Sequence, residues 1–208
     1  MTDSNYTHIL MIVDKSGSMR SLTKDTIGGY NAFLDEMRKL PGKTHITTVL
    51  FDTEFVCLNA NEDVHTAKVL SEDTYRPDGF TALLDAMGRI IADTGQVFAG
   101  MREDERPGKV IAAIITDGEE NSSREYSRQT IKSMVEEQQE KYKWNFVFLG
   151  ANIDSFAAAG SLGIGETGTT NYSATGCGTQ SAYRGMAKAV LSVAENGTLD
   201  ENWKVDVQ

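Results

Sequence analysis

Cysteine, histidine and proline are scarce in this sequence of 208 residues, which holds two, three and three of them. Cys57 and Cys177 stand far apart and form neither a CxxC pair nor a cluster with histidine. A disulfide framework and a structural zinc site are therefore not indicated, and a chain of this length buries enough surface to fold without either. We expect both thiols to be reduced.

Positive charge is also in short supply. The chain carries 20 Lys and Arg residues against 30 Asp and Glu residues, for a formal net charge of -10. The resulting field opposes nonspecific attraction to phosphate backbones and to anionic lipid surfaces. Nucleic acid and membrane are therefore not expected as partners.

Long hydrophobic runs and a basic N-terminal region are absent too. The apolar run from Ile9 to Val13 is too short for the hydrophobic part of a signal peptide or for a membrane span. We therefore expect a cytoplasmic protein. With 40% hydrophobic and 24% charged residues, the composition is that of a globular protein, and the length favours one domain.

Apolar segments alternate between short runs and helical spacing, which predicts strands alternating with crossover helices. We expect strands at 8–13, 46–51, 55–58, 110–115 and 146–149, a short edge strand at 169–172, and helices at about 25–40, from near 81, and at 127–142, 153–162 and 180–194. The gap between the second and third strands is too short for a crossover helix, so these strands should form an antiparallel hairpin. The fold class is thus α/β, a doubly wound, mostly parallel central sheet with one antiparallel strand and helices on both faces. The domain covers 1–196, and 197–208 form a C-terminal tail.

Oxygen-bearing side chains occur in three loops of this predicted fold. Asp14, Ser16 and Ser18 follow the first buried strand, Asp117 follows the most apolar strand, and Thr81 opens a helix. The carboxyl ends of parallel strands form the ligand-binding edge of such a sheet. Hydroxyl and carboxylate oxygens are hard ligands that suit Mg²⁺, and the lack of histidine and cysteine in the set argues against zinc.

This arrangement resembles the metal-ion-dependent adhesion site of von Willebrand factor A (vWA) domains, in which Asp-x-Ser-x-Ser is followed by a Thr and then by an Asp after a later strand. Asp14, Ser16, Ser18, Thr81 and Asp117 match all five positions, and the order of elements agrees from about residue 6 to residue 195. The resemblance implies a Rossmann-like vWA domain in which strands one and four lie side by side. It also implies that these five residues bind one Mg²⁺, with Mn²⁺ or Ca²⁺ as alternatives.

The resemblance further implies how such a site works. In the family the hydroxyls usually contact the metal directly, while one or both Asp residues act through water when ligand is bound. Neutral inner ligands leave much of the ion's charge unquenched, so the metal can accept a Glu or Asp carboxylate from a partner protein. A metal-dependent protein-binding module, not an enzyme, is therefore expected.

The organisation is similar to that of stand-alone intracellular bacterial and phage vWA domains, including tellurite-resistance-associated members. Many of these domains work beside AAA+ ATPases or other assembly components, which are the partners that the resemblance suggests. No residue singles out one subgroup.

Two other functions stay open. A metal-dependent phosphohydrolase would use Asp14 as a nucleophile or would activate a water on the metal. However, Ser16 stands where the haloacid-dehalogenase type requires a second Asp. The other alternative is a structural or assembly subunit in which the metal only stabilises loops.

Several of these residues also have simpler interpretations. Ser16 and Ser18 could turn the chain, and Thr81 could cap a helix. We expect Glu119 and Glu120 to be solvated charges at the rim of the site. Lys15 is likewise expected to be exposed.

Overall fold

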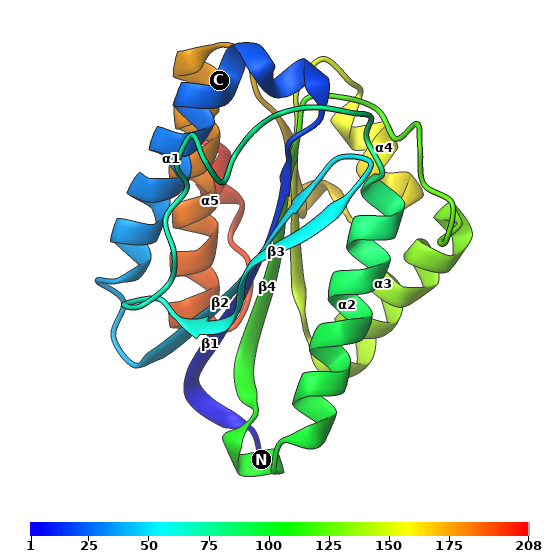
Figure 1. The fold of residues 1–208 in the computed structure, drawn as a ribbon. Helices are drawn as coiled ribbons and strands as arrows, with labels where there is room; N and C mark the ends of the chain where they lie inside the picture. The colour runs from blue at the N-terminus through cyan, green and yellow to red at the C-terminus, as the bar shows by residue number, and fades with distance from the viewer. Residues whose placement is uncertain (208) are drawn as a thin grey trace.

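The structure is a computed structural model that describes residues 1–207, and it contains six strands and five α-helices (Figure 1). The strands are β1 (Asp3–Asp14), β2 (Lys43–Phe51), β3 (Phe55–Asp63), β4 (Pro107–Thr116), β5 (Asn145–Gly150) and β6 (Thr169–Asn171). The helices are α1 (Thr23–Met37), α2 (Leu83–Gly100), α3 (Arg128–Tyr142), α4 (Ser155–Ser161) and α5 (Gly176–Asn196), with 3-10 turns η1 (Gly17–Leu22), η2 (Glu103–Glu105), η3 (Glu166–Gly168) and η4 (Glu201–Lys204). Every element expected from the sequence is present. Within the described residues, no helix is both long and apolar enough to span a bilayer.

All six strands belong to one sheet, in the order β3-β2-β1-β4-β5-β6. β1 runs parallel to both β2 and β4, and β5 and β6 continue in the same direction. β3 is antiparallel to β2, as the short connection between them predicts. The predicted doubly wound, mostly parallel α/β fold is confirmed.

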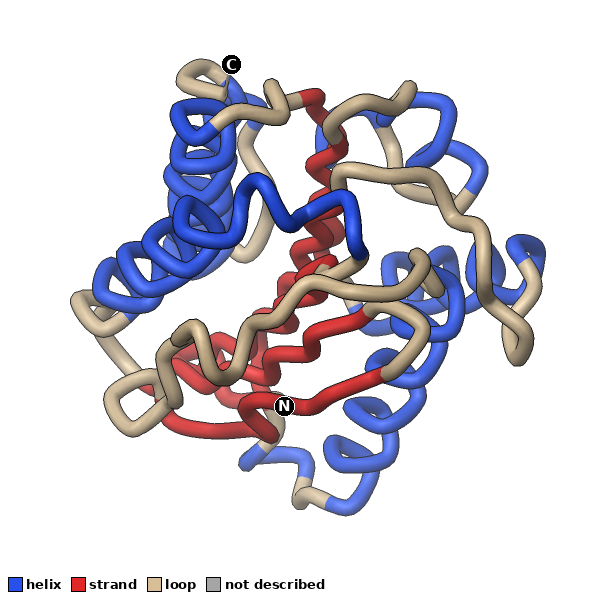
Figure 2. Tube along the Cα trace, turned by 45° about the horizontal axis from the view of Figure 1, so that its top comes forward, coloured by secondary structure: helices blue, strands red, loops and turns tan. Residues whose placement is uncertain are grey.

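Two apolar cores lie on the two faces of this sheet. Along β1, Ile9, Met11 and Val13 belong to the core beneath α1 and α5, while Leu10 and Ile12 belong to the core beneath α2, α3 and α4. The alternation follows from the two-residue period of a strand. Burial on both faces also explains the continuous apolar run in the sequence of β1. Figure 2 shows the strands between the two groups of helices.

The winding of the chain reverses between β1 and β4. The next strand in the chain, β2, lies on one side of β1, and β4 lies on the other. The register pairs Val13 with Ile115, so the two strands end at the same level. Loops leave a parallel sheet in opposite directions at such a point and open a crevice there. The topology therefore brings the strand-end residues Asp14 and Asp117 to the place where open α/β sheets bind ligands.

The sequence suggests a tail after Gly197, and residues 198–207 of this segment pack against α5. The turn η4 places Trp203 in the main core with 1% of its surface exposed. The indole Nε1 of Trp203 donates to the carbonyl of Thr167 at 3.0 Å. A single tryptophan in a polar segment creates no apolar periodicity, so the sequence pattern does not predict this contact.

His8 is a buried titratable group in the middle of β1. Its Nε2 lies 3.1 Å from the hydroxyl of Thr47. Burial, with smaller contributions from the charges of His45 and Lys43, lowers the pKa of His8 from 6.5 to about 3. The unfolded chain therefore binds a proton that the folded chain excludes, at any pH between these two values. The stability that neutral His8 contributes is full above the unfolded pKa and is lost as the pH falls below it.

Between about pH 6 and pH 4, we expect the free energy of unfolding of the wild type to fall as the pH decreases. The slope should be steeper than that of His8→Leu by about 1.4 kcal/mol per pH unit. Leucine takes up no proton in either state, so it removes this term. Urea unfolding at a series of pH values measures the slopes. His65→Leu, at an exposed histidine, is the control and should keep the wild-type slope. Parallel curves for wild type and His8→Leu would contradict the prediction.

Candidate metal centre

Asp14 is the last residue of β1, and its side chain is completely buried. Its Oδ1 accepts the backbone N–H of Ser16 at 2.7 Å, and its Oδ2 accepts the hydroxyl of Thr116, at the end of β4, at 2.6 Å. The hydroxyl of Tyr75 donates to the carbonyl of Asp14 at 2.6 Å. Asp14 thus joins the loop after β1 to the neighbouring strand and to the segment after β3.

The other four predicted residues lie around one small space. The hydroxyls of Ser16 and Ser18 are 3.1 Å apart, and Ser18 Oγ donates to Asp117 Oδ1 at 2.6 Å. A Cβ added to Gly118 would lie 3.6 Å from Thr81 Oγ1 and 3.8 Å from Ser18 Oγ. Both hydroxyls therefore border the space that a side chain at position 118 would enter, and glycine leaves this space open.

Both carboxyl groups lie where negative charge is unfavourable. Burial raises the pKa of Asp14 to about 6, against the hydrogen bonds from Thr116 and Ser16, and the nearby charge of Asp117 adds to the rise. Burial also raises the pKa of Asp117, although the hydrogen bond from Ser18 favours its ionised form. Two converging carboxylates repel each other unless a cation or a proton offsets their charge.

The donor set fits a divalent cation that prefers oxygen. In the part of the chain that the structure describes, the hydroxyl of Thr81 has no hydrogen-bond partner, although the residue is buried. Among residues 1–207, no three His, Cys, Asp or Glu side chains are grouped for metal binding. A cation at this site would therefore be held by hydroxyls together with two carboxylates, which are the ligands that Mg²⁺ and Mn²⁺ accept.

The loop after β4 is fastened to the start of α2 by side chains that sequence reasoning misses. Asn121 Oδ1 accepts the backbone N–H of Thr81 at 2.9 Å, and the N–H of Asn121 donates to the Thr81 carbonyl at 3.0 Å. Asp85 accepts the backbone N–H groups of residues 124–126. These contacts position Thr81 against the strand end that carries Asp117.

Glu120 is not the solvated rim charge that the sequence suggests. Its carboxylate accepts the N–H of Leu84, in the first turn of α2, at 3.0 Å. It also accepts the N–H groups of Ser122 and Ser123 at 2.9 and 2.7 Å and the Ser123 hydroxyl at 2.8 Å. A carboxylate at a helix N-terminus is further stabilised by the helix dipole. Glu119, by contrast, is exposed as expected.

Lys15 is buried, although the sequence suggests an exposed side chain; only 9% of its surface is accessible to solvent. Its ammonium pairs with Asp52 in the turn between β2 and β3. Its backbone N–H donates to the carbonyl of Phe51 at 2.7 Å, and its own carbonyl accepts the N–H of Asp78 at 2.9 Å. Lys15 therefore ties the loop after β1 to the β2–β3 turn and to the loop that carries Thr81.

The fold matches several solved structures at low sequence identity. The vWF domain of the type V pili tip protein Mfa5 from Porphyromonas gingivalis aligns with a TM-score of 0.62 and 12% identity, over 94% of this chain and 98% of that one. The chain has the vWA fold. No protein-family model and no curated protein matches the sequence.

Two further structures with this fold are described with a metal. Proximal thread matrix protein 1 of the mussel byssus, with a zinc-occupied MIDAS motif, aligns with a TM-score of 0.59 and 15% identity, over 94% of this chain and 46% of that one. The manganese-loaded TRAP protein of Plasmodium vivax aligns with a TM-score of 0.55 and 13% identity, over 82% and 70% of the two chains. This chain spans about half the length of the mussel protein chains that it matches.

We expect Glu120→Ala to lower the free energy of unfolding by about 2 kcal/mol, because it leaves partly buried N–H groups at the start of α2 and in the loop after β4 without their acceptor. Urea unfolding monitored by circular dichroism measures the change. Glu119→Ala removes the adjacent exposed carboxylate and should change the same quantity by less than about 0.5 kcal/mol. Equal effects of the two substitutions would show that Glu120 does not fasten this loop.

Proposed function

We propose that the chain is a metal-dependent protein-binding module that holds one divalent cation, Mg²⁺ in the first place, through Asp14, Ser16, Ser18, Thr81 and Asp117. The observation that carries the proposal is the meeting of three hydroxyls and the Asp117 carboxylate around the space left open by glycine at position 118. The buried Asp14 carboxylate accepts the N–H of Ser16 and the hydroxyl of Thr116 next to them, at the switch point of the sheet. The zinc and manganese described for two proteins of the same fold make Mn²⁺ and Zn²⁺ the alternatives to test.

The proposed ligands include both neutral and charged oxygens. Ser16, Ser18 and Thr81 offer neutral hydroxyl oxygens, while Asp14 and Asp117 offer charge from the strand ends. Thr116 holds one oxygen of Asp14, and Ser18 holds one oxygen of Asp117. When bound, the cation supplies a positive centre with capacity for one more carboxylate oxygen. A Glu or Asp side chain of a partner protein is the ligand that fits this centre.

An exposed aromatic side chain supports a protein partner over a small anion. Phe80 precedes Thr81 and leaves 66% of its surface exposed beside the polar site. Exposed aromatic residues next to a polar centre are typical of protein interfaces, where they supply much of the binding energy. An AAA+ ATPase or another assembly component, encountered in the cytoplasm, remains the partner that the sequence resemblance suggests.

The histidines give no support to hydrolysis at this site. In residues 1–207, His8 is paired with Thr47 and His45 with Asn61, and neither contacts the hydroxyls of Ser16 or Ser18. A serine nucleophile needs a general base within hydrogen-bond reach. We therefore propose binding, and not hydrolysis by a serine nucleophile, as the function of the strand-end residues.

We expect Mg²⁺ to raise the melting temperature by about 3 to 6 °C when its free concentration is about ten times its dissociation constant, because it binds the assembled site and not the unfolded chain. Differential scanning calorimetry measures the shift, and isothermal titration gives the affinity. Thr81→Val removes a hydroxyl that has no hydrogen-bond partner, so it should abolish most of the shift at little cost to the metal-free fold.

Thr198→Val is the matched control, because it removes an exposed threonine hydroxyl after α5, near the start of β5 and thus at the opposite edge of the sheet from the proposed metal site. It should keep the full response to Mg²⁺. A Thr81→Val protein that responds like wild type would refute the assigned ligands. So would a wild type that shows no response to Mg²⁺, Mn²⁺ or Zn²⁺.

We expect partner binding to disappear in EDTA and to return with Mg²⁺ or Mn²⁺. Affinity purification with the metal and again with EDTA identifies the partner. Changing each exposed carboxylate of its contact segment to the amide should then reveal one dominant residue. Phe80→Ala should weaken this binding about tenfold and leave the metal affinity unchanged, since it removes interface contact only. Glu119→Gln is the control at the rim and should change neither.

Two outcomes of that experiment would overturn the proposed mechanism. The first is a partner that binds with equal affinity in EDTA. The second is a partner in which no single acidic residue matters, which would make the metal a purely structural ion.

A further inference from the structure

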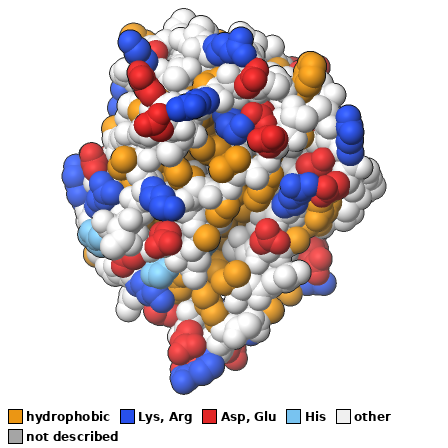
Figure 3. All heavy atoms as spheres, viewed as in Figure 1, with side chains coloured by type: hydrophobic (Ala, Val, Ile, Leu, Met, Phe, Trp, Pro, Cys, Tyr) orange, Lys and Arg blue, Asp and Glu red, His pale blue; other side chains and the backbone are white. Residues whose placement is uncertain are grey.

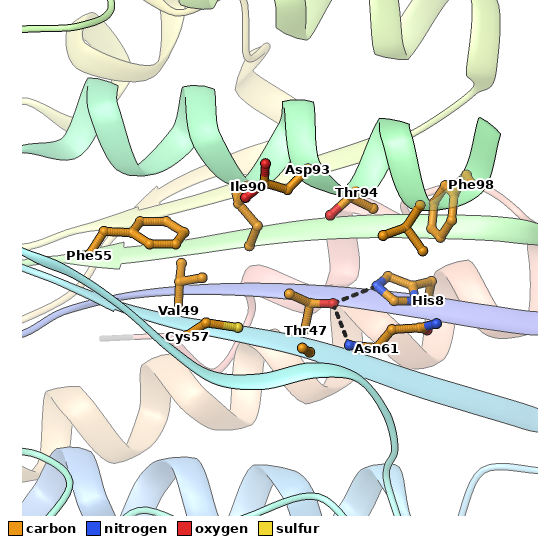
Figure 4. Close-up of a pocket in the computed structure, with 12 residues that line it drawn as sticks. His8, Thr47, Val49, Phe55, Cys57, Asn61, Ile90, Asp93, Thr94 and Phe98 are labelled. Atoms are coloured by element: carbon orange, nitrogen blue, oxygen red, sulfur yellow. Dashed lines mark hydrogen bonds between the residues drawn. The ribbon is translucent and has the colours of Figure 1, made fainter. Parts of the chain in front are cut away.

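A cavity of about 190 Å³ lies between α2 and the β2–β3 hairpin and shares no residue with the strand-end site. Phe55 and Phe98 stand at its two ends, with Val49 from the sheet facing Ile90 from α2 (Figure 4). On the surface of this face, apolar side chains gather in a band between the hairpin and α2 (Figure 3). The cavity is smaller than most sites for drug-sized ligands, so it suits a small molecule with one ring.

The floor of the cavity is polar but uncharged. The hydroxyl of Thr47 lies 3.1 Å from His8 Nε2 and accepts the N–H of Asn61 at 3.1 Å. The Nδ1 atom of His8 is buried and has no hydrogen-bond partner among residues 1–207. Because burial lowers the pKa of His8 to about 3, its ring is neutral at physiological pH. No positive charge at the floor would therefore repel a cationic ligand.

Asp93 is the one charged side chain among the residues that line the cavity. It is exposed on α2, and no ion pair or hydrogen bond of its carboxylate occurs in residues 1–207. The carboxylate lies close enough to Cys57, on β3, that its charge adds to the effect of burial in raising the pKa of that thiol, while the charge of Lys68, which does not line the cavity, acts less strongly in the opposite direction. The mouth of an apolar cavity thus carries one unpaired negative charge, which favours a cation at that position.

We propose that this cavity binds a small amine with a single-ring apolar body. The ring lies between Phe55 and Phe98, against Val49 and Ile90, and the ammonium group faces Asp93. A neutral analogue would leave Asp93 unpaired, and an acidic analogue would be repelled by it. The inference is independent of metal binding, since it concerns another part of the sheet.

Two exposed cysteines give a direct test, because Cys57 lines the cavity and Cys177, at the start of α5, does not. The rate of alkylation of each thiol by iodoacetamide is measured by peptide mass spectrometry with and without phenethylamine. We expect about 5 mM phenethylamine to slow alkylation of Cys57 roughly sixfold, as for a dissociation constant of about 1 mM, and to leave Cys177 unchanged. The neutral 2-phenylethanol should protect Cys57 less, and phenylacetate least.

Variants distinguish the contribution of the Asp93 charge to ligand binding from that of the cavity space. Asp93→Asn should reduce protection by phenethylamine to the level of 2-phenylethanol, while Asp35→Asn, an exposed change on α1, should keep it. Ala60→Phe places a ring in the cavity and should abolish protection by all three compounds. Each rate is compared with and without ligand in the same variant, because the charge of Asp93 itself slows the reaction of Cys57. Equal protection by amine, alcohol and acid, protection that survives in Ala60→Phe, or no protection by phenethylamine would each overturn the proposal.

Discussion

The burial of Asp14 is the constraint on which the strand-end site depends. A carboxylate without solvent is costly unless hydrogen bonds replace the lost water. Here the backbone of Ser16 and the hydroxyl of Thr116 supply those bonds, and Tyr75 holds the main chain from behind. The loop after β1, the end of β4 and the segment after β3 cannot shift separately without breaking one of them. The fold itself therefore fixes the position of the Asp14 carboxylate relative to the loop after β1 and to the end of β4.

Much of this architecture is readable from the sequence because it rests on local signals. The apolar runs of β1 and β4 reveal strands buried on both faces, and the short gap before Phe55 reveals the antiparallel hairpin. Strand ends are then fixed by where the apolar runs stop. The pattern places Asp14 and Asp117 at the same ligand-binding edge of a parallel sheet, and the vWA resemblance implies that their strands lie side by side. The structure confirms that these strands are neighbours.

The contacts that the sequence hides all join polar residues across long separations. Lys15 looks like an exposed charge until β2 is placed beside β1 and brings Asp52 to it, and Glu120 looks solvated until the loop after β4 reaches α2. Trp203 is the apolar counterpart, a single large side chain in a polar segment. Periodicity carries no information about such pairings, because each depends on where two unrelated segments meet. The cavity beneath α2 is hidden for the same reason, being a space between elements and not a property of either.

The separation between the strands that carry Asp14 and Thr116 has a consequence for how the protein is made. These two bonded residues are 102 positions apart in the chain. At a synthesis rate of about 5–20 residues per second, the interval between the synthesis of β1 and that of its partner β4 is roughly 5–20 s. During that interval β2 can cover one edge of β1, but the other edge stays open. We therefore expect the nascent chain to be most vulnerable to aggregation, and most dependent on chaperones, just before β4 leaves the ribosome.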